Sequence, residues 1–95
     1  NIKLAKCGGL SRARSMAAIA EENGLLIVLG CMIESSLGIT AAAHLAPQAD
    51  FIDLDGAALL DNDPFEGVTL EEGILHLPER QGLGVVPRSG MGAME

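Results

Sequence analysis

The run Leu25-Leu26-Ile27-Val28-Leu29 decides the fold class of this 95-residue chain. It has the length of a strand, it has no polar face, and glycines (Gly24 and Gly30) stand at both ends. Such a run is typical of a parallel strand buried on both faces. Parallel strands need crossover connections, which are usually helices. The run therefore predicts an α/β fold with a parallel sheet.

Helical patterns and two further strand patterns flank this run. Ser11 can cap a helix with apolar residues at helical spacing that ends at Asn23-Gly24, and Ser35 or Ser36 can cap a second helix through Ala46, closed by Pro47. Strand patterns cover residues 1–6, where Ile2 and Leu4 alternate with Lys3 and Ala5, and Phe51–Asp55. The order predicts two right-handed βαβ units with helices outside the sheet.

Two acidic residues interrupt the last of these strands. Asp53 and Asp55 would share one face of a strand, about 6.6 Å apart, while Ile52 and Leu54 share the other. Unpaired buried carboxylates are costly, so the pair indicates a site for a small cation. An exposed edge strand whose acids face water is the alternative that the pattern leaves open.

Polar residues also stand at the ends of the other two strands, where α/β folds collect reactive groups. Lys3 lies opposite Ile2 and Leu4, so it points inward if those residues face the helices, and a desolvated Lys can act as a base. A surface Lys on an edge strand is the alternative. Cys31, Met32 and Ile33 follow the second strand.

Other chemistry-bearing residues fit structural roles better. We interpret Lys6 as solvated or structural, and Glu34 as a first-turn helix residue favoured by the dipole, with an acid in the site as the alternative. His44 has no partner at ligand spacing, and the Cys7-Gly8-Gly9 turn lacks a phosphate-binding pattern.

Composition narrows the range of partners and compartments. The net charge of -7 argues against nucleic acid and anionic membranes, and no apolar stretch is long enough for a membrane span. Cys7 and Cys31 are interpreted as buried thiols in a reducing compartment, which predicts a cytoplasmic protein. The chain opens at Asn1 in mid-strand, as expected for a piece of a longer protein.

After Leu60 the sequence becomes rich in turn residues. Val68–Leu70 and Ile74–Leu77 predict a hairpin around Glu72-Gly73, and Gly82–Val86 predicts an extended segment. We therefore expect residues 1–60 to form one unit, residues 61–88 an extended segment, and residues 89–95 a flexible tail.

Four blocks of this sequence resemble the dipeptide epimerases (L-Ala-D/L-Glu epimerase-like) of the muconate-lactonizing subgroup in the enolase superfamily. They are Asn1–Gly9, Gly30–Ser35, Ala41–His44 and Asp53–Gly56. The resemblance implies strands six to eight of a (β/α)7β TIM-type barrel, in residues 1–6, Leu25–Gly30 and Phe51–Asp55, followed by a segment that returns to an α+β capping domain.

The resemblance also implies roles for individual residues. Lys3 would be one of two catalytic bases, Asp53 and Asp55 would bind the substrate's α-ammonium group, and Cys31, Met32 and Ile33 would line the substrate pocket. The implied reaction is a Mg²⁺-assisted two-base 1,1-proton transfer at an α-carbon of a dipeptide. Acidic Mg²⁺ ligands and the first catalytic Lys would lie outside these 95 residues, so this chain would hold no metal site.

Other functions stay open at this point. A cycloisomerase or an o-succinylbenzoate synthase of the same superfamily shares the sixth-strand Lys, but its substrate has no ammonium group for an acid pair. A non-catalytic half-barrel or assembly module is the alternative of another class. We expect the segment to need the remainder of the barrel and the capping domain, to be an isomerase that is inactive in isolation, and to favour a homo-oligomer if its strand edges are exposed.

Overall fold

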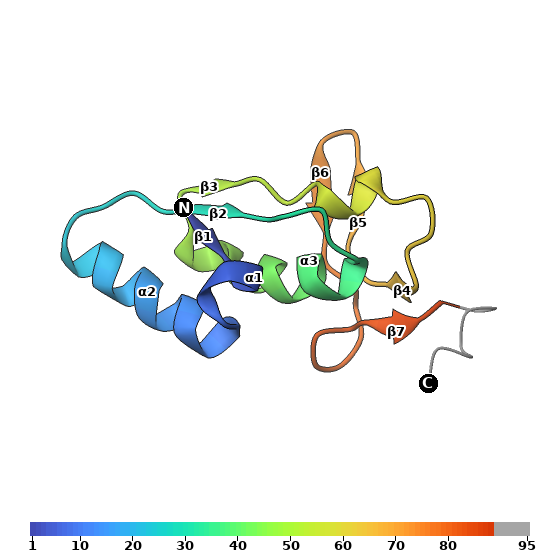
Figure 1. Ribbon diagram of the computed structural model, residues 1–95, viewed down its shortest axis with the longest axis horizontal. Helices are drawn as coiled ribbons and strands as arrows, with labels where there is room; N and C mark the ends of the chain where they lie inside the picture. The colour runs from blue at the N-terminus through green and yellow to red at the C-terminus, as the bar shows by residue number, and fades with distance from the viewer. Residues whose placement is uncertain (89–95) are drawn as a thin grey trace.

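The chain folds around three short parallel strands, as seen in the computed structural model, which describes residues 1–88 (Figure 1). The sheet order is β1-β2-β3, and the strands are β1 (Ile2–Lys3), β2 (Val28–Gly30) and β3 (Phe51–Ile52). Both pairings are parallel, so the α/β class and the βαβαβ order are confirmed. The predicted tail at residues 89–95 lies outside the described residues.

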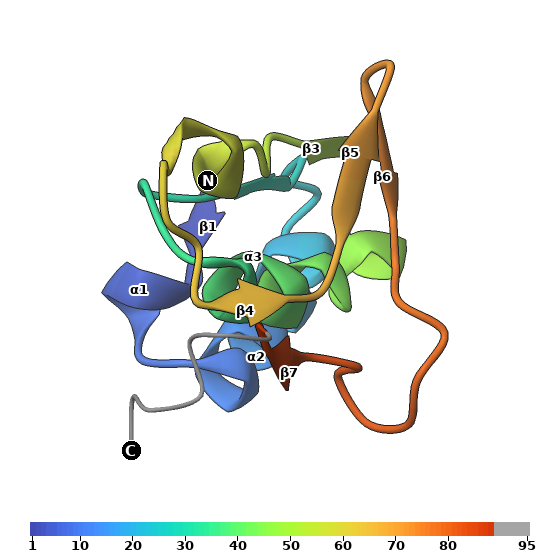
Figure 2. The same ribbon diagram turned by 90° about the vertical axis from the view of Figure 1, so that its right-hand side faces the viewer.

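Helices connect the strands and cover one face of the sheet (Figures 1 and 2). They are α1 (Leu4–Cys7), α2 (Leu10–Glu22) and α3 (Ser36–Ala43), with the 3-10 helix η1 (Ala46–Gln48); a second 3-10 helix, η2 (Gly56–Leu59), follows β3. None of the helices in residues 1–88 is long and apolar enough to cross a membrane.

The core lies between the sheet and these helices. Small residues of α2 and α3 allow close packing on larger aliphatic side chains of the strands; the buried set is Ile2, Ala13, Ala17, Ile27, Leu29, Ile39, Ala42, Ala43, Leu45 and Leu54. Leu29 and Ile39 are each only 1% exposed. With about 25 cal/mol for each Å² of buried apolar surface, this layer is the main stabilising contribution of the described fold.

The strands are shorter than the sequence predicted, and the central run is not buried on both faces. Leu25 and Leu26 are 62% and 72% exposed because they belong to the connection before β2. The first strand ends at Lys3, since residues Leu4–Cys7 turn into α1 and place Lys6 on that helix. The helices cover one face of the sheet only. An apolar run in the sequence does not tell which elements cover the other face.

Two helix boundaries also differ from the prediction. Gly9, not Ser11, precedes the first turn of α2, and α3 ends at Ala43 with His44 as its cap. Pro47 lies inside the separate helix η1. α2 begins after the Gly8-Gly9 turn, where φ is 99° and 116°, and Asn23 caps its end. Local backbone preference sets both boundaries.

The C-terminal part forms two antiparallel pairs. β5 (Thr69–Glu71) pairs with β6 (Ile74–His76), which confirms the predicted hairpin, and β4 (Phe65–Glu66) pairs with β7 (Val86–Pro87). Glu72 and Gly73 both have positive φ (51° and 81°), as a two-residue type I′ turn requires. The hairpin projects beyond the sheet (Figure 2), and β4 contacts α3.

Candidate functional site

The strand register aligns two predicted site residues, Lys3 and Asp53, with Gly30 between them. Ile2 pairs with Leu29 and Leu29 with Ile52, while Lys3 pairs with Gly30. The Asp53 N–H donates to the Leu29 carbonyl oxygen at 2.8 Å, which continues the β2–β3 pairing by one residue. Lys3, Gly30 and Asp53 are therefore aligned across the three strands.

This row lies on the face of the sheet opposite the core. Ile2, Leu29 and Leu54 are buried under the helices, and side chains alternate along each strand, so Lys3, Gly30 and Asp53 face the other way. Neighbouring strands are roughly 4.8 Å apart, which puts the backbones of Lys3 and Asp53 about 10 Å apart. Gly30 contributes no side chain to the gap between them. The row thus sets a cationic and an anionic side chain on the same face of the sheet, two strands apart.

Lys3 also lines a recess beside β1. This β1 recess, about 590 Å³ in volume, is formed by Asn1, Lys3, Lys6, Cys7, Arg12 and Met16. Lys3 itself is half-buried, whereas Lys6 is exposed. An amine that is partly withdrawn from water at the carboxyl end of a strand is suitably placed for proton transfer, provided that a substrate binds on the same face.

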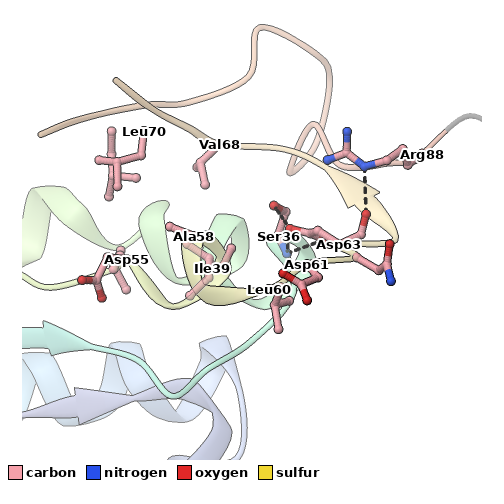
Figure 3. Close-up of a pocket in the computed structure, with 14 residues that line it drawn as sticks. Ser36, Ile39, Asp55, Ala58, Leu60, Asp61, Asp63, Val68, Leu70 and Arg88 are labelled. Atoms are coloured by element: carbon pink, nitrogen blue, oxygen red, sulfur yellow. Dashed lines mark hydrogen bonds between the residues drawn. The ribbon is translucent and has the colours of Figure 1, made fainter. Parts of the chain in front are cut away.

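The two acidic residues do not lie in one extended strand, as the sequence predicted. Because β3 ends at Ile52, Asp55 stands at the start of η2 (φ −98°, ψ 5°) rather than in an extended strand. Asp53 is exposed on the open face, and Asp55 is exposed at the rim of a second recess (Figure 3). Among residues 1–88 the ion pairs join Arg80 and Arg88 to Glu66, so neither aspartate has a cationic partner there.

Cys31, Met32 and Ile33 form the loop after β2, close to Asp55. A Cβ at Gly56, the residue after Asp55, would collide with the Met32 carbonyl oxygen and come within 3.2 Å of the Cys31 Sγ. The glycine therefore lets the two strand ends approach each other directly. Cys31 is half-buried, while Met32 and Ile33 are 45% and 66% exposed.

The remaining candidates have structural positions. Glu34 precedes α3 instead of lying in its first turn, and its carboxylate accepts a hydrogen bond from the Met32 N–H at 3.0 Å, so it shapes the loop. The His44 ring nitrogen Nδ1 lies 2.7 Å from the Thr40 carbonyl oxygen at the end of α3, in line with a packing or surface role. Cys7 and Cys31 are both free thiols.

A second recess, about 500 Å³, lies between α3, η2 and the C-terminal hairpin (Figure 3). We call it the α3 recess; its lining includes Ser36, Ile39, Asp55, Asp63, Leu70 and Arg88. The Asp63 carboxylate accepts hydrogen bonds from the Ser36 hydroxyl, the Ser36 N–H and the Phe65 N–H. Burial alone would raise the pKa of Asp63, but these hydrogen bonds and the nearby Arg88 hold that pKa below its usual value.

Asp63 and Arg88 are residues that sequence reasoning missed. The Arg88 guanidinium donates to the Asp63 and Phe65 carbonyl oxygens, at 2.8 and 3.1 Å. The turn composition around Asp63 was visible in the sequence, but no local pattern links it to a helix that begins 27 positions earlier. Asp63 anchors the C-terminal segment to α3, and Arg88 holds the end of that segment against residues 63–66.

The residues 1–88 contain no group of three or more His, Cys, Asp or Glu side chains that could hold a metal ion. Divalent Mg²⁺ prefers near-octahedral oxygen coordination with one or more carboxylates. Asp53 and Asp55 are not part of any such group within the described residues.

Comparison with known proteins places the chain in a family. Residues 1–90 match the model of the family described as "Enolase C-terminal domain-like". The chain is 47% identical over 85 residues to the L-Ala-D/L-amino acid epimerase of Flavobacterium johnsoniae, with 90% of the chain and 25% of that protein covered. It is 42% identical over 90 residues to the L-Ala-D/L-Glu epimerase of Bacillus subtilis, with the same coverage.

A solved structure agrees with this match. The dipeptide epimerase of Methylococcus capsulatus, complexed with Mg and the dipeptide L-Arg-D-Lys, superposes with a TM-score of 0.84 at 50% identity, over 90% of this chain and 25% of that one. The chain thus spans about a quarter of the length of these relatives. The match extends over nearly all of its residues, and the chain belongs to the enolase C-terminal domain-like family.

Proposed function

We propose that this chain supplies one catalytic base and the substrate's ammonium anchor to a dipeptide epimerase whose barrel is completed by residues outside it. The observation that carries the proposal is the row of Lys3, Gly30 and Asp53 on the open face of the sheet. A lysine and an aspartate lie two strands apart on one face of the sheet, in a chain whose relatives are dipeptide epimerases. In this arrangement β1, β2 and β3 act as strands six, seven and eight of the barrel.

Lys3 acts in the proposal as the base on one face of the substrate. Its neutral amine takes the proton from the α-carbon of the second residue, and the electrons of the broken C–H bond move into the adjacent carboxylate to form an enediolate. A second base from the rest of the barrel returns a proton on the opposite face, which inverts the centre. One base on each face is the arrangement that inversion requires.

Asp53 and Asp55 hold the α-ammonium group of the first residue. A charged carboxylate that accepts N–H hydrogen bonds from an ammonium group forms a charge-assisted contact, which is stronger than a neutral one. Fixing this end of the dipeptide places the second α-carbon near Lys3, and such positioning lowers the barrier by avoiding a search for the reactive geometry. In the proposal Cys31, Met32 and Ile33, which form the loop after β2, line the substrate pocket.

No step of this scheme runs through a metal held by this chain, because the described residues do not provide a Mg²⁺ site. Relatives have been solved in complexes with Mg. We propose that ligands outside these residues hold the ion, and that the 95-residue chain alone does not catalyse epimerisation. The C-terminal segment 61–88 is proposed to lead back to the capping domain.

Deuterium exchange tests the proposal. The full-length protein is incubated with L-Ala-L-Glu and a panel of other dipeptides in D₂O with Mg²⁺, and incorporation at the second α-carbon is followed by NMR. We expect exchange with at least one dipeptide, and its loss in Lys3→Ala. Arg14→Ala, which removes an exposed cation on α2, is the matched control. If no dipeptide shows exchange, the chain does not belong to an epimerase. If Lys3→Ala keeps full activity, Lys3 is not a catalytic base.

A further inference from the structure

The Asn1 side chain occupies the space above Gly30. A Cβ added at Gly30 would lie 2.5 Å from the Asn1 Oδ1 and 3.3 Å from both Cγ and Nδ2. Asn1 precedes Ile2, whose side chain is buried in the core, so Asn1 and Lys3 share the open face by strand alternation. The carboxamide therefore reaches from β1 across to β2, where the missing side chain of Gly30 makes room for it.

This position is the middle of the row that joins Lys3 to Asp53. Gly30 pairs with Lys3 on one side and is level with Asp53 on the other, so a group above Gly30 lies between the base and the acid. Asn1 also lines the β1 recess together with Lys3. The carboxamide is thus next to the base and within the gap that the proposed substrate would fill.

The hydrogen-bonding groups of the Asn1 carboxamide are not used within the described part of the chain. No side-chain hydrogen bond of Asn1 to another of the residues 1–88 is found. A carboxamide offers one acceptor oxygen and two N–H donors. A peptide group offers the complementary N–H donor and carbonyl acceptor. The two groups can therefore form a pair of hydrogen bonds with each other.

In a dipeptide the peptide group lies between the two ends that this site would hold. The α-ammonium nitrogen and the second α-carbon are about 5 Å apart in an extended dipeptide, and the peptide bond joins them. If Asp53 holds the ammonium group and Lys3 faces the second α-carbon, the peptide bond passes over Gly30. We propose that Asn1 is a substrate-positioning residue that recognises the peptide group of the dipeptide, with Gly30 providing the space for its carboxamide. This inference rests on the proposed function.

The test uses the full-length protein and two ligands that differ only in one group of the peptide bond. Dissociation constants are measured for L-Ala-L-Glu and for its ester analogue, in which oxygen replaces the peptide N–H. We expect the wild-type protein to bind the dipeptide about tenfold more tightly than the ester, because the ester lacks the donor. Asn1→Ala should weaken dipeptide binding about tenfold and abolish the preference for the amide. Asn23→Ala, a change at the exposed end of α2, is the matched control.

Gly30→Ala is a second, independent test of the inference. The added methyl group would displace the carboxamide, so this variant should lose the same preference, and Asn1→Ala with Gly30→Ala should lose no more than either change alone. Melting temperatures of all variants are recorded alongside. An unchanged amide-to-ester ratio in Asn1→Ala overturns the inference, and so does equal weakening of both ligands. If the wild-type protein neither binds nor exchanges any dipeptide, the proposed function itself fails, which is a separate result.

Discussion

The Asp63 carboxylate accepts hydrogen bonds from the N–H and the hydroxyl of Ser36, the first residue of α3, which lies 27 positions earlier in the chain. The first N–H groups of a helix have no partner inside the helix, and a carboxylate there also interacts favourably with the helix dipole. Ser35, the residue directly before the helix, makes no side-chain capping bond. A distant residue thus provides the cap and fixes the C-terminal segment at the same time.

Replacing Asp63 by Ala should lower the free energy of unfolding by about 1–2 kcal/mol, the range found for lost helix caps. The N–H and hydroxyl of Ser36 would lose their acceptor, and Ser36 is buried. Urea unfolding followed by circular dichroism measures the effect. Asp61→Ala, which removes an exposed carboxylate two positions earlier, should change stability by much less; equal losses in the two variants would contradict the capping role.

The same carboxylate predicts a pH dependence. Its pKa in the folded protein is lowered from the ordinary value of 3.8, so the charged form is favoured in the folded state. The stability that this provides is fully present above the unfolded-state pKa and is lost as the pH falls through the lower, folded pKa. Asp63→Asn should therefore flatten the decline in melting temperature below about pH 5. If the melting temperatures of the two proteins fall in parallel between pH 6 and pH 3, the prediction is wrong.

Thr40→Val should destabilise the protein by about 1–3 kcal/mol, although the two side chains are similar in shape. Thr40 is fully buried, and its Oγ1 accepts a hydrogen bond from the Val68 N–H at 2.9 Å. Valine leaves that N–H without its acceptor. Thr40→Ser keeps the oxygen, and hydrogen exchange at the Val68 amide separates the two cases: we expect fast exchange with Val and near wild-type exchange with Ser.

Glu72→Asn should stabilise the hairpin β5–β6 by up to about 1 kcal/mol. Glu72 has φ 51°, a left-handed conformation that most residues adopt at a cost but that Asn tolerates well. Amide exchange rates in β5 and β6 provide the measurement. Glu71→Asn changes a residue within the strand, so it should give no such gain. A gain from both substitutions would point to charge removal rather than to backbone conformation.

Asp53→Asn combined with Asp55→Asn should weaken dipeptide binding by about 100-fold or more in the full-length protein, since two charge-assisted hydrogen bonds that each contribute about 1.5–3 kcal/mol are lost. Binding of N-acylated dipeptides, which lack the ammonium group, should be nearly unchanged. Calorimetric titration with both ligand types measures the contrast, and Glu71→Gln serves as an exposed control. A similar loss for both ligands would mean that the pair acts on the fold and not on the ammonium group.

Sequence patterns predicted the hairpin and the order of the strands and helices, because these features depend on local backbone preferences and on the spacing of apolar residues. The apolar run ending at Leu29, the stop at Asn23-Gly24 and the turn at Glu72-Gly73 all act within a few residues. The strand ends were predicted less well. Leu4 is apolar and follows an extended residue, yet it begins α1, because packing rather than alternation ends that strand.

The sequence by itself determined the parallel α/β order and the presence of Lys3 and Asp53 at strand ends, since periodicity and residue type are local properties. Only the tertiary structure decided that Lys3, Gly30 and Asp53 form one row, that Asn1 lies above Gly30, and that Asp63 caps α3. These relationships depend on register and on the docking of distant segments. Pairing register and helix capping across 27 positions arise from packing of the whole layer, which no local pattern encodes.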